Sequence, residues 1–127
     1  MCPPSDRREP ELAVISAMEN LPHLLPSLSR LNRETTDIII SALHLCVHFK
    51  FAQFLQGENN PASLAKVFDA VRYEQDGIAV LKVFAFMNVC VMAGLTGTIS
   101  YQGSLFLTEP NAIMVLLAIE TLRATAA

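Results

Sequence analysis

Apolar side chains recur along this chain with the three- and four-residue spacing that is typical of helices. A first amphipathic helix is expected over Glu9–Asn20, and Pro22 ends it because proline disfavours helix at the residue before it. Leucines at helical spacing follow over His23–Leu31. A long helix is then predicted over Glu34–Leu55, with Asn32 as its N-cap.

The GENNP segment at positions 57–61 separates this long helix from the next one. Gly57 suits a helix C-cap, and Pro61 suits the first position of a new helix. That new helix is predicted over Pro61–Val71, and a very apolar helix follows over Ile78–Ala93. Gly94 stands where a left-handed C-cap is expected.

The pattern changes period after the apolar helix. Thr98–Tyr101 and Ser104–Leu107 are short segments around a two-residue turn at Gln102 and Gly103, which predicts a β-hairpin. Thr108 is a natural N-cap for a last helix over Glu109–Thr125. A helix-turn-helix, a hairpin wing and a closing helix follow one another in the winged-helix order. We therefore expect a mainly α winged-helix fold with extra N-terminal and C-terminal helices, forming one domain over residues 10–127 after a disordered tail at 1–9.

Composition adds an interaction surface to this picture. The chain has 127 residues, of which 52% are hydrophobic and 17% charged, and so short a chain has too little interior to hide them all. Ile78–Ala93 and Ile113–Ile119 are apolar on every side, so we expect a partner chain to cover part of them. The predicted interface draws on the first helices, the long helix and the last helix: Leu12, Ile15, Met18, Leu24, Leu25, Leu28, Ile39, Leu43, Ile113, Leu116, Leu117 and Ile119.

The charge pattern argues against nucleic acid as the partner. The net charge is −3, the pI is near 5.5, and the expected wing at positions 100–104 has no Lys or Arg to meet phosphates. A DNA-binding winged-helix regulator is nevertheless the main alternative, because it has the same order of elements. A helical protein-interaction adaptor of another architecture is the second alternative, and it predicts no hairpin at Thr98–Leu107.

Compartment and membrane contact follow from composition as well. Gly77–Leu95 approaches the length of a bilayer span, but Lys82 and Asn88 are costly in hydrocarbon. The N-terminus has no apolar segment of the kind found in secretory signals. The three cysteines are far apart and odd in number, which favours a reducing compartment. We expect a cytoplasmic protein with no membrane partner.

Candidate chemistry is sparse. Asp37, His44 and His48 fall close to one helical stripe, but two histidines at i, i+4 need a third ligand to hold a metal ion. Cys46 and Cys90 lie in apolar helices, where a free cysteine usually packs as a small apolar residue, and a nucleophilic role would need a nearby basic activator. We predict no catalytic, metal or cofactor-binding residues, and hence no enzyme activity of this chain by itself.

Four segments of Ser41–Asn111 carry a resemblance to a known family: ALHLCVHFKFAQFL, NPASLAKVFDAV, AVLKVFAFMNVCVMAGL and TISYQGSLFLTEPN. Together they resemble the N-terminal winged-helix domain of S-adenosylmethionine-dependent O-methyltransferases of the plant and fungal small-molecule type. In that family this domain forms a dimer and lines the partner's substrate pocket, while the chemistry belongs to a Rossmann domain. No Gly-rich cofactor loop of such a domain is found here.

The resemblance implies a non-catalytic dimerisation module, or accessory subunit, in small-molecule biosynthesis. Such a module would form a homodimer, or a heteromer with a catalytic methyltransferase chain. It would also help to bind an apolar small molecule. The candidate residues for that pocket wall are Phe49, Phe51, Phe54, Met87 and Met92.

Overall fold

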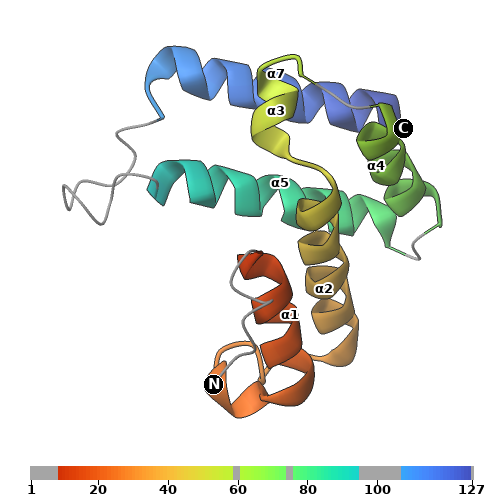
Figure 1. Ribbon diagram of the computed structural model, residues 1–127, viewed down its shortest axis with the longest axis vertical. Coiled ribbons are helices and arrows are strands. Elements are labelled where there is room, and N and C mark those ends of the chain that lie inside the picture. Colours follow the sequence, from red (N-terminus) through yellow and green to blue (C-terminus); the bar gives the residue numbers. More distant parts are fainter. Residues whose placement is uncertain (1–8, 59–60, 74–75, 95–106, 127) are drawn as a thin grey trace.

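The computed structural model describes residues 9–58, 61–73, 76–94 and 107–126, and every regular element in them is a helix (Figure 1). The elements in chain order are α1 (Pro10–Asn20), the short 3₁₀ helix η2 (Pro22–Leu24), α2 (Arg33–His48), α3 (Phe51–Leu55), α4 (Pro61–Tyr73), α5 (Gly77–Gly94) and α7 (Glu109–Ala126).

Helix α5 lies at the centre of the arrangement. It packs mainly on α2 and α4, and α7 runs antiparallel beside it while also contacting α3 and α4 (Figure 1). Helix α1 lies alongside α2, η2 packs on α1, and this part extends away from the α5–α7 end of the molecule (Figure 1). The molecule therefore has an N-terminal arm, made of α1, η2 and the adjoining part of α2, and a helical body that contains the main core.

Several helix ends lie where capping residues predict them. Asn32 Oδ1 accepts a hydrogen bond of 2.8 Å from the Thr35 backbone N–H, which confirms the predicted N-cap of α2. Pro61 begins α4, and Gly57 has a φ of +72° just after α3, as expected for a glycine that closes a helix. The expected left-handed conformation of Gly94 is wrong, because Gly94 is the last helical residue of α5.

The long helix predicted over Glu34–Leu55 is wrong in one respect, because it is broken at Phe49 and Lys50. Both residues have extended backbone, so α2 ends at His48 and α3 begins at Phe51. Phe49 and Phe51 are each only 2% exposed. Residues two apart point to different sides of a helix but to the same side of an extended segment, so the break allows both rings to enter the core.

The winged-helix prediction is also wrong. The described residues contain no strand, and α7 packs directly on α3, α4 and α5, so the core is closed by helices alone. The hairpin was predicted from two short segments around a turn within Thr98–Leu107, which lies outside the described residues apart from Leu107. Leu107 is half-buried and packs against the helical core. The coarser expectation of a mainly α fold is confirmed.

The core is built around aromatic rings contributed by three elements. The ring centroid of Phe84 in α5 lies 5.9 Å from that of Phe49 and 6.1 Å from that of Phe51. Phe54 of α3 packs on the two rings of its own segment, at 5.6 and 6.3 Å. Tilted and edge-on contacts at these distances are favourable for aromatic pairs. They fix α3 and the end of α2 against the middle of α5.

Glycine sets the corner between α4 and α5. A Cβ placed on Gly77 would lie 2.6 Å from the Val71 Cα and would also meet the Val71 carbonyl oxygen. The first turn of α5 can therefore approach the last turns of α4 only because residue 77 has no side chain.

Candidate functional site

Helix α7 presents apolar side chains to solvent. Ile113, Met114, Leu116 and Leu117 are 51, 54, 61 and 58% exposed, while Val115, Ala118 and Leu122 form the buried face of the helix. An exposed apolar side chain is ordinary when it stands alone, but here four lie within five consecutive positions. The outer face of α7 is therefore a candidate binding surface.

Helix α5 exposes apolar side chains at wider intervals. Ile78, Phe86 and Val91 are 50, 69 and 63% exposed. Among the described helices, α5 alone is long and apolar enough to cross a membrane by length and composition, and 28% of its residues are buried inside the protein. A core helix of a soluble protein satisfies the same criteria, so this property does not identify a membrane protein.

Two depressions adjoin α7. One, of about 180 Å³, lies between the start of α5 and the end of α7, with Leu81 and Leu122 among its apolar residues and Lys82 and Arg123 beside them. The other, of about 400 Å³, lies between α3, α5 and α7. The second combines apolar walls with three side-chain amides and has no charged side chain in its lining: Ala52, Leu55, Gln56, Asn88, Val91, Met92, Asn111, Met114 and Val115.

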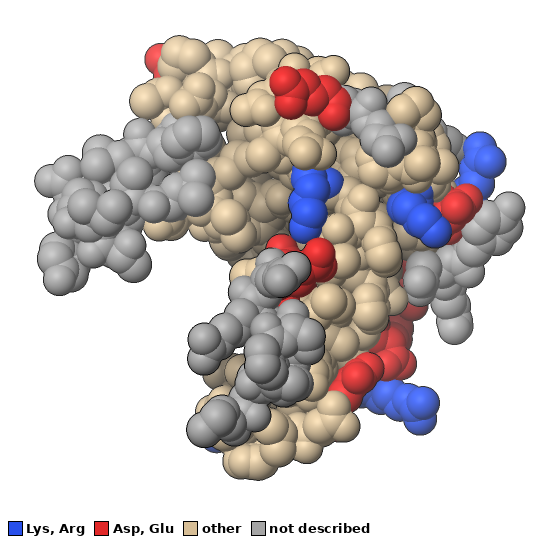
Figure 2. Space-filling model, viewed as in Figure 1, with Lys and Arg blue, Asp and Glu red and all other residues tan. Residues whose placement is uncertain are grey.

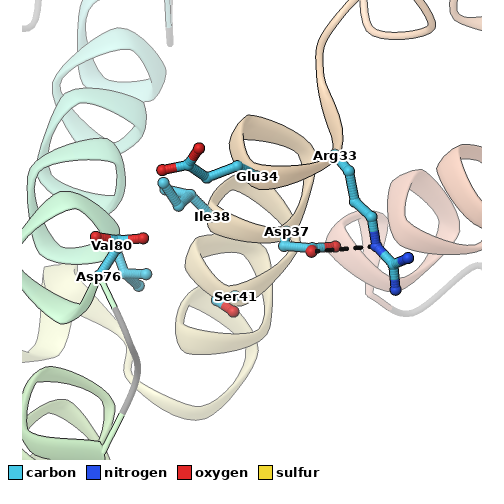
Figure 3. Close-up of a pocket in the computed structure, with 7 residues that line it drawn as sticks. All are labelled: Arg33, Glu34, Asp37, Ile38, Ser41, Asp76 and Val80. Carbon is cyan, nitrogen blue, oxygen red and sulfur yellow. Dashed lines mark ion pairs between the residues drawn. The ribbon is translucent and has the colours of Figure 1, made fainter.

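A third depression, of about 570 Å³, lies between α2 and the start of α5 (Figure 3). Glu34 and Asp76 stand on its two sides, while Asp37 turns away toward Arg33, with 3.8 Å between Arg33 Nε and Asp37 Oδ2 (Figure 3). Both members of this ion pair are largely exposed, so it adds little stability. The depression is broad and acidic, and no group of three metal-ligating side chains occurs in the described residues.

His44 and His48 line a depression of about 420 Å³ between α2 and α4. Lys66 and Asp69 of α4 share this lining with them. Asp37, the third candidate metal ligand, instead forms an ion pair with Arg33. Asp37 also lines a different depression from the two histidines.

The thiol of Cys46 is held in its protonated form. Burial, with a smaller contribution from nearby Glu11, raises the pKa of Cys46 to about 11, although Lys50 and a hydrogen bond with Asn88 act in the opposite direction. Asn88 is itself fixed by a hydrogen bond of 2.8 Å from its Nδ2 to the Phe84 carbonyl oxygen. Because nucleophilic catalysis needs a thiolate, this environment is the opposite of an activating one.

Charged side chains do not form a single patch on the face shown in Figure 2. Lys and Arg lie apart from one another there, and most of the surface over α5 and α7 is uncharged. Counterion release from nucleic acid needs clustered cations. This distribution agrees with the net charge of −3 in giving no support to a nucleic-acid surface.

Residues 7–127 match the model of DUF6829, a family of unknown function. The chain belongs to this family. No curated protein and no solved structure matches the chain. Membership of DUF6829 assigns no activity, and the resemblance to methyltransferase domains stays a prediction.

The residues predicted to form an interface fall into three groups in this DUF6829 protein. Ile113, Leu116 and Leu117 share the exposed side of α7, and Leu12 and Leu24 are exposed on the N-terminal arm. Ile15 and Leu43 are buried within the protein. The remaining five are half-buried: Met18, Leu25, Leu28, Ile39 and Ile119. The structure therefore does not bring all twelve together on one surface.

The residues predicted to line a pocket lie mostly in the core. Phe49 and Phe51 are buried, Phe54 and Met87 pack against the core, and Met92 lines the cavity between α3, α5 and α7. Sequence reasoning did not find the amides of Gln56 and Asn111 in that cavity. Their positions just after α3 and in the first turn of α7 carry no periodic signal that would have indicated it.

Proposed function

We propose that this protein is a helical binding module that pairs with another protein chain through the outer face of α7 and performs no chemical step itself. The exposure of Ile113, Leu116 and Leu117 on adjacent turns of one helix is the observation that supports this proposal most. Monomeric soluble proteins rarely expose a large contiguous patch of apolar side chains, and such a patch usually marks a binding site. Each covered side chain then contributes about 25 cal/mol per Å² of apolar surface removed from water.

The environment of Cys46 supports only the part of the proposal that excludes chemistry at this thiol. A thiol whose pKa is raised to about 11 is almost fully protonated near neutral pH and is a poor nucleophile. The partner in this proposal is a protein chain, and a methyltransferase is not specified, because the winged-helix fold that this resemblance implied is absent from the described residues. A cytoplasmic location, an apolar small molecule as a further ligand, and the absence of nucleic-acid and membrane partners stay predictions.

Site-specific photo-crosslinking in cells tests the proposal. Leu117 and Leu24 are the same residue type and are both 58% exposed, so a benzophenone amino acid at each position gives a matched pair. We expect protein adducts from position 117 and far fewer from position 24. The added substitution Leu116→Asp should abolish the adducts at 117, because it places a charge in the apolar contact.

Equal adduct yields at the two positions, or adducts at 117 that survive Leu116→Asp, would show that the outer face of α7 is not a binding surface.

A further inference from the structure

The outer face of α7 carries a stripe with a defined order of charge. Glu109, Ile113, Leu116, Glu120 and Arg123 follow one another at alternating spacings of four and three residues, and all five are exposed. This alternation keeps side chains on one line along a helix, as in the seam of a coiled coil. Glu109 begins the stripe, Ile113 and Leu116 form its apolar middle, and the ion-paired Glu120 and Arg123 end it.

The two end positions of this stripe, Glu109 and Arg123, are complementary when one of two identical helices is reversed. Glu109 and Arg123 each lie seven residues from Leu116, which corresponds to roughly 10 Å along the helix axis in either direction. In an antiparallel pair centred on Leu116, Glu109 of each copy is therefore level with Arg123 of the other copy. A parallel pair would instead place Glu109 beside Glu109 and Arg123 beside Arg123, which is repulsive at both ends.

We propose that the chain which covers the outer face of α7 is a second copy of this protein, docked antiparallel about a two-fold axis at Leu116. This inference rests on the proposed function and specifies its partner. Leu116 meets Leu116 of the second copy at the axis, and Ile113 and Leu117 surround this contact. Two equivalent Glu109–Arg123 contacts close the ends, as a two-fold interface requires.

The surroundings of the stripe fit this arrangement. Arg123 also lines the apolar depression beside α5, so the stripe borders a surface where Ile78 is 50% exposed. Within one copy, Arg123 Nη2 lies 2.8 Å from Glu120 Oε2, and this pair is more than half exposed, so it costs little to rearrange. One helix face gives a small interface, so we expect dissociation in the micromolar range.

Charge reversal combined with analytical ultracentrifugation of the full chain tests the inference. Glu109→Arg and Arg123→Glu should each weaken the dimer about 10-fold, because each creates two like-charge contacts. An equimolar mixture of the two variants should regain wild-type association, since both end contacts in the mixed dimer then join opposite charges. The variant that carries both reversals should also associate like wild type.

Matched controls separate these contacts from general charge effects and from unfolding. Glu19→Arg and Arg33→Glu reverse exposed charges on α1 and α2 and should leave the dimer unchanged. Circular dichroism at low concentration reports whether each variant keeps its helices, and recovery in the mixture cannot come from misfolded chains.

Two results would overturn the inference and leave the proposed function intact. The first is a wild-type chain that stays monomeric through the micromolar range while position 117 crosslinks to a different protein. The second is a dimer that Leu116→Asp disrupts but single charge reversals do not. If position 117 gives no adducts that depend on Leu116, the proposed function fails as well.

Discussion

Helices α5 and α7 have the same length and similarly apolar middles but very different surroundings. Each has 18 residues, and α7 carries its charged side chains toward its two ends. Five residues of α5 are buried, namely Gly77, Val80, Leu81, Phe84 and Met92, because the helix packs on α2, α4 and α7. Helix α7 lies at the edge, and its buried face consists of Val115, Ala118 and Leu122.

The difference shows that a helix can be apolar because its own chain buries it or because another chain covers it. In α5 the exposed large side chains, Ile78, Phe86 and Val91, are separated along the helix. The buried side chains of α5 form part of the core, so α5 acts mainly as a core helix. In α7 the exposed ones are adjacent and form a surface. Hydrophobicity on every side therefore indicates burial, and only the packing shows whether this chain or another provides it.

The largest expected effect separates the two faces of α5. Phe84→Ala should lower the free energy of unfolding by about 3–5 kcal/mol, because Phe84 is fully buried against Phe49 and Phe51. Phe86→Ala should change it by less than about 0.5 kcal/mol, since Phe86 is 69% exposed. Urea denaturation followed by circular dichroism measures both. Similar losses for the two variants would mean that the outer face of α5 is covered in solution and that the contrast with α7 is wrong.

An intermediate effect is expected at the two ends of α5. Gly77→Ala should destabilise the protein by about 1–3 kcal/mol, because the new methyl group would meet the Val71 backbone. Gly94→Ala is the matched control, since a Cβ there meets nothing within 4 Å, and it should be neutral or slightly stabilising. Thermal unfolding of both variants measures the difference. If Gly77→Ala left the stability unchanged, the first turn of α5 would not lie as close to the Val71 backbone as the structure places it.

The smallest expected effect is the pH dependence of stability that Cys46 causes, on the side of α2 that faces α5. The pKa of Cys46 is raised from 9.0 to about 11 in the folded chain, so its contribution to stability is fully present below pH 9 and is lost as pH rises toward 11. The difference in unfolding free energy between wild type and Cys46→Ala should therefore shrink across this window. Cys90→Ala, at an exposed position of α5, is the matched control, and its unfolding free energy should fall with rising pH as much as that of the wild type.

Thiol labelling gives an independent measurement of the same contrast. In a Cys2→Ser background, a thiol reagent at pH 8 should modify Cys90 well before Cys46, because only a thiolate reacts and Cys46 is protonated there. Equal labelling rates would contradict the burial of Cys46 beside Asn88.

Local chemistry predicted much of the helix layout and less of the packing. Asn32, Gly57 and Pro61 mark helix ends because each satisfies a backbone requirement within its own turn. The break at Phe49 is different. Its cause is the joint burial of Phe49 and Phe51 against Phe84, a residue more than thirty positions away, and periodicity within one window carries no information about that contact.

The candidate site was predictable only in part for the same reason. The apolar excess over Ile113–Ile119 indicated a partner surface, and the exposed side of α7 includes Ile113, Leu116 and Leu117. The phenylalanines of α3 were predicted to line a pocket, but Phe51 is buried against Phe84 of α5, and Phe54 packs on Phe49 and Phe51. The winged-helix prediction was wrong because the order of short elements was used to infer a fold, whereas the observed core depends on which helix faces meet.

The two-residue break between α2 and α3 also limits how the length of this chain can vary during evolution. One residue inserted between Phe49 and Phe51 would turn one ring out of the core, because successive side chains of an extended segment point to opposite sides. Residues 56–58, by contrast, are exposed and follow α3 in a turn. Members of DUF6829 should therefore differ in length after Leu55 and keep a constant spacing between these two phenylalanine positions.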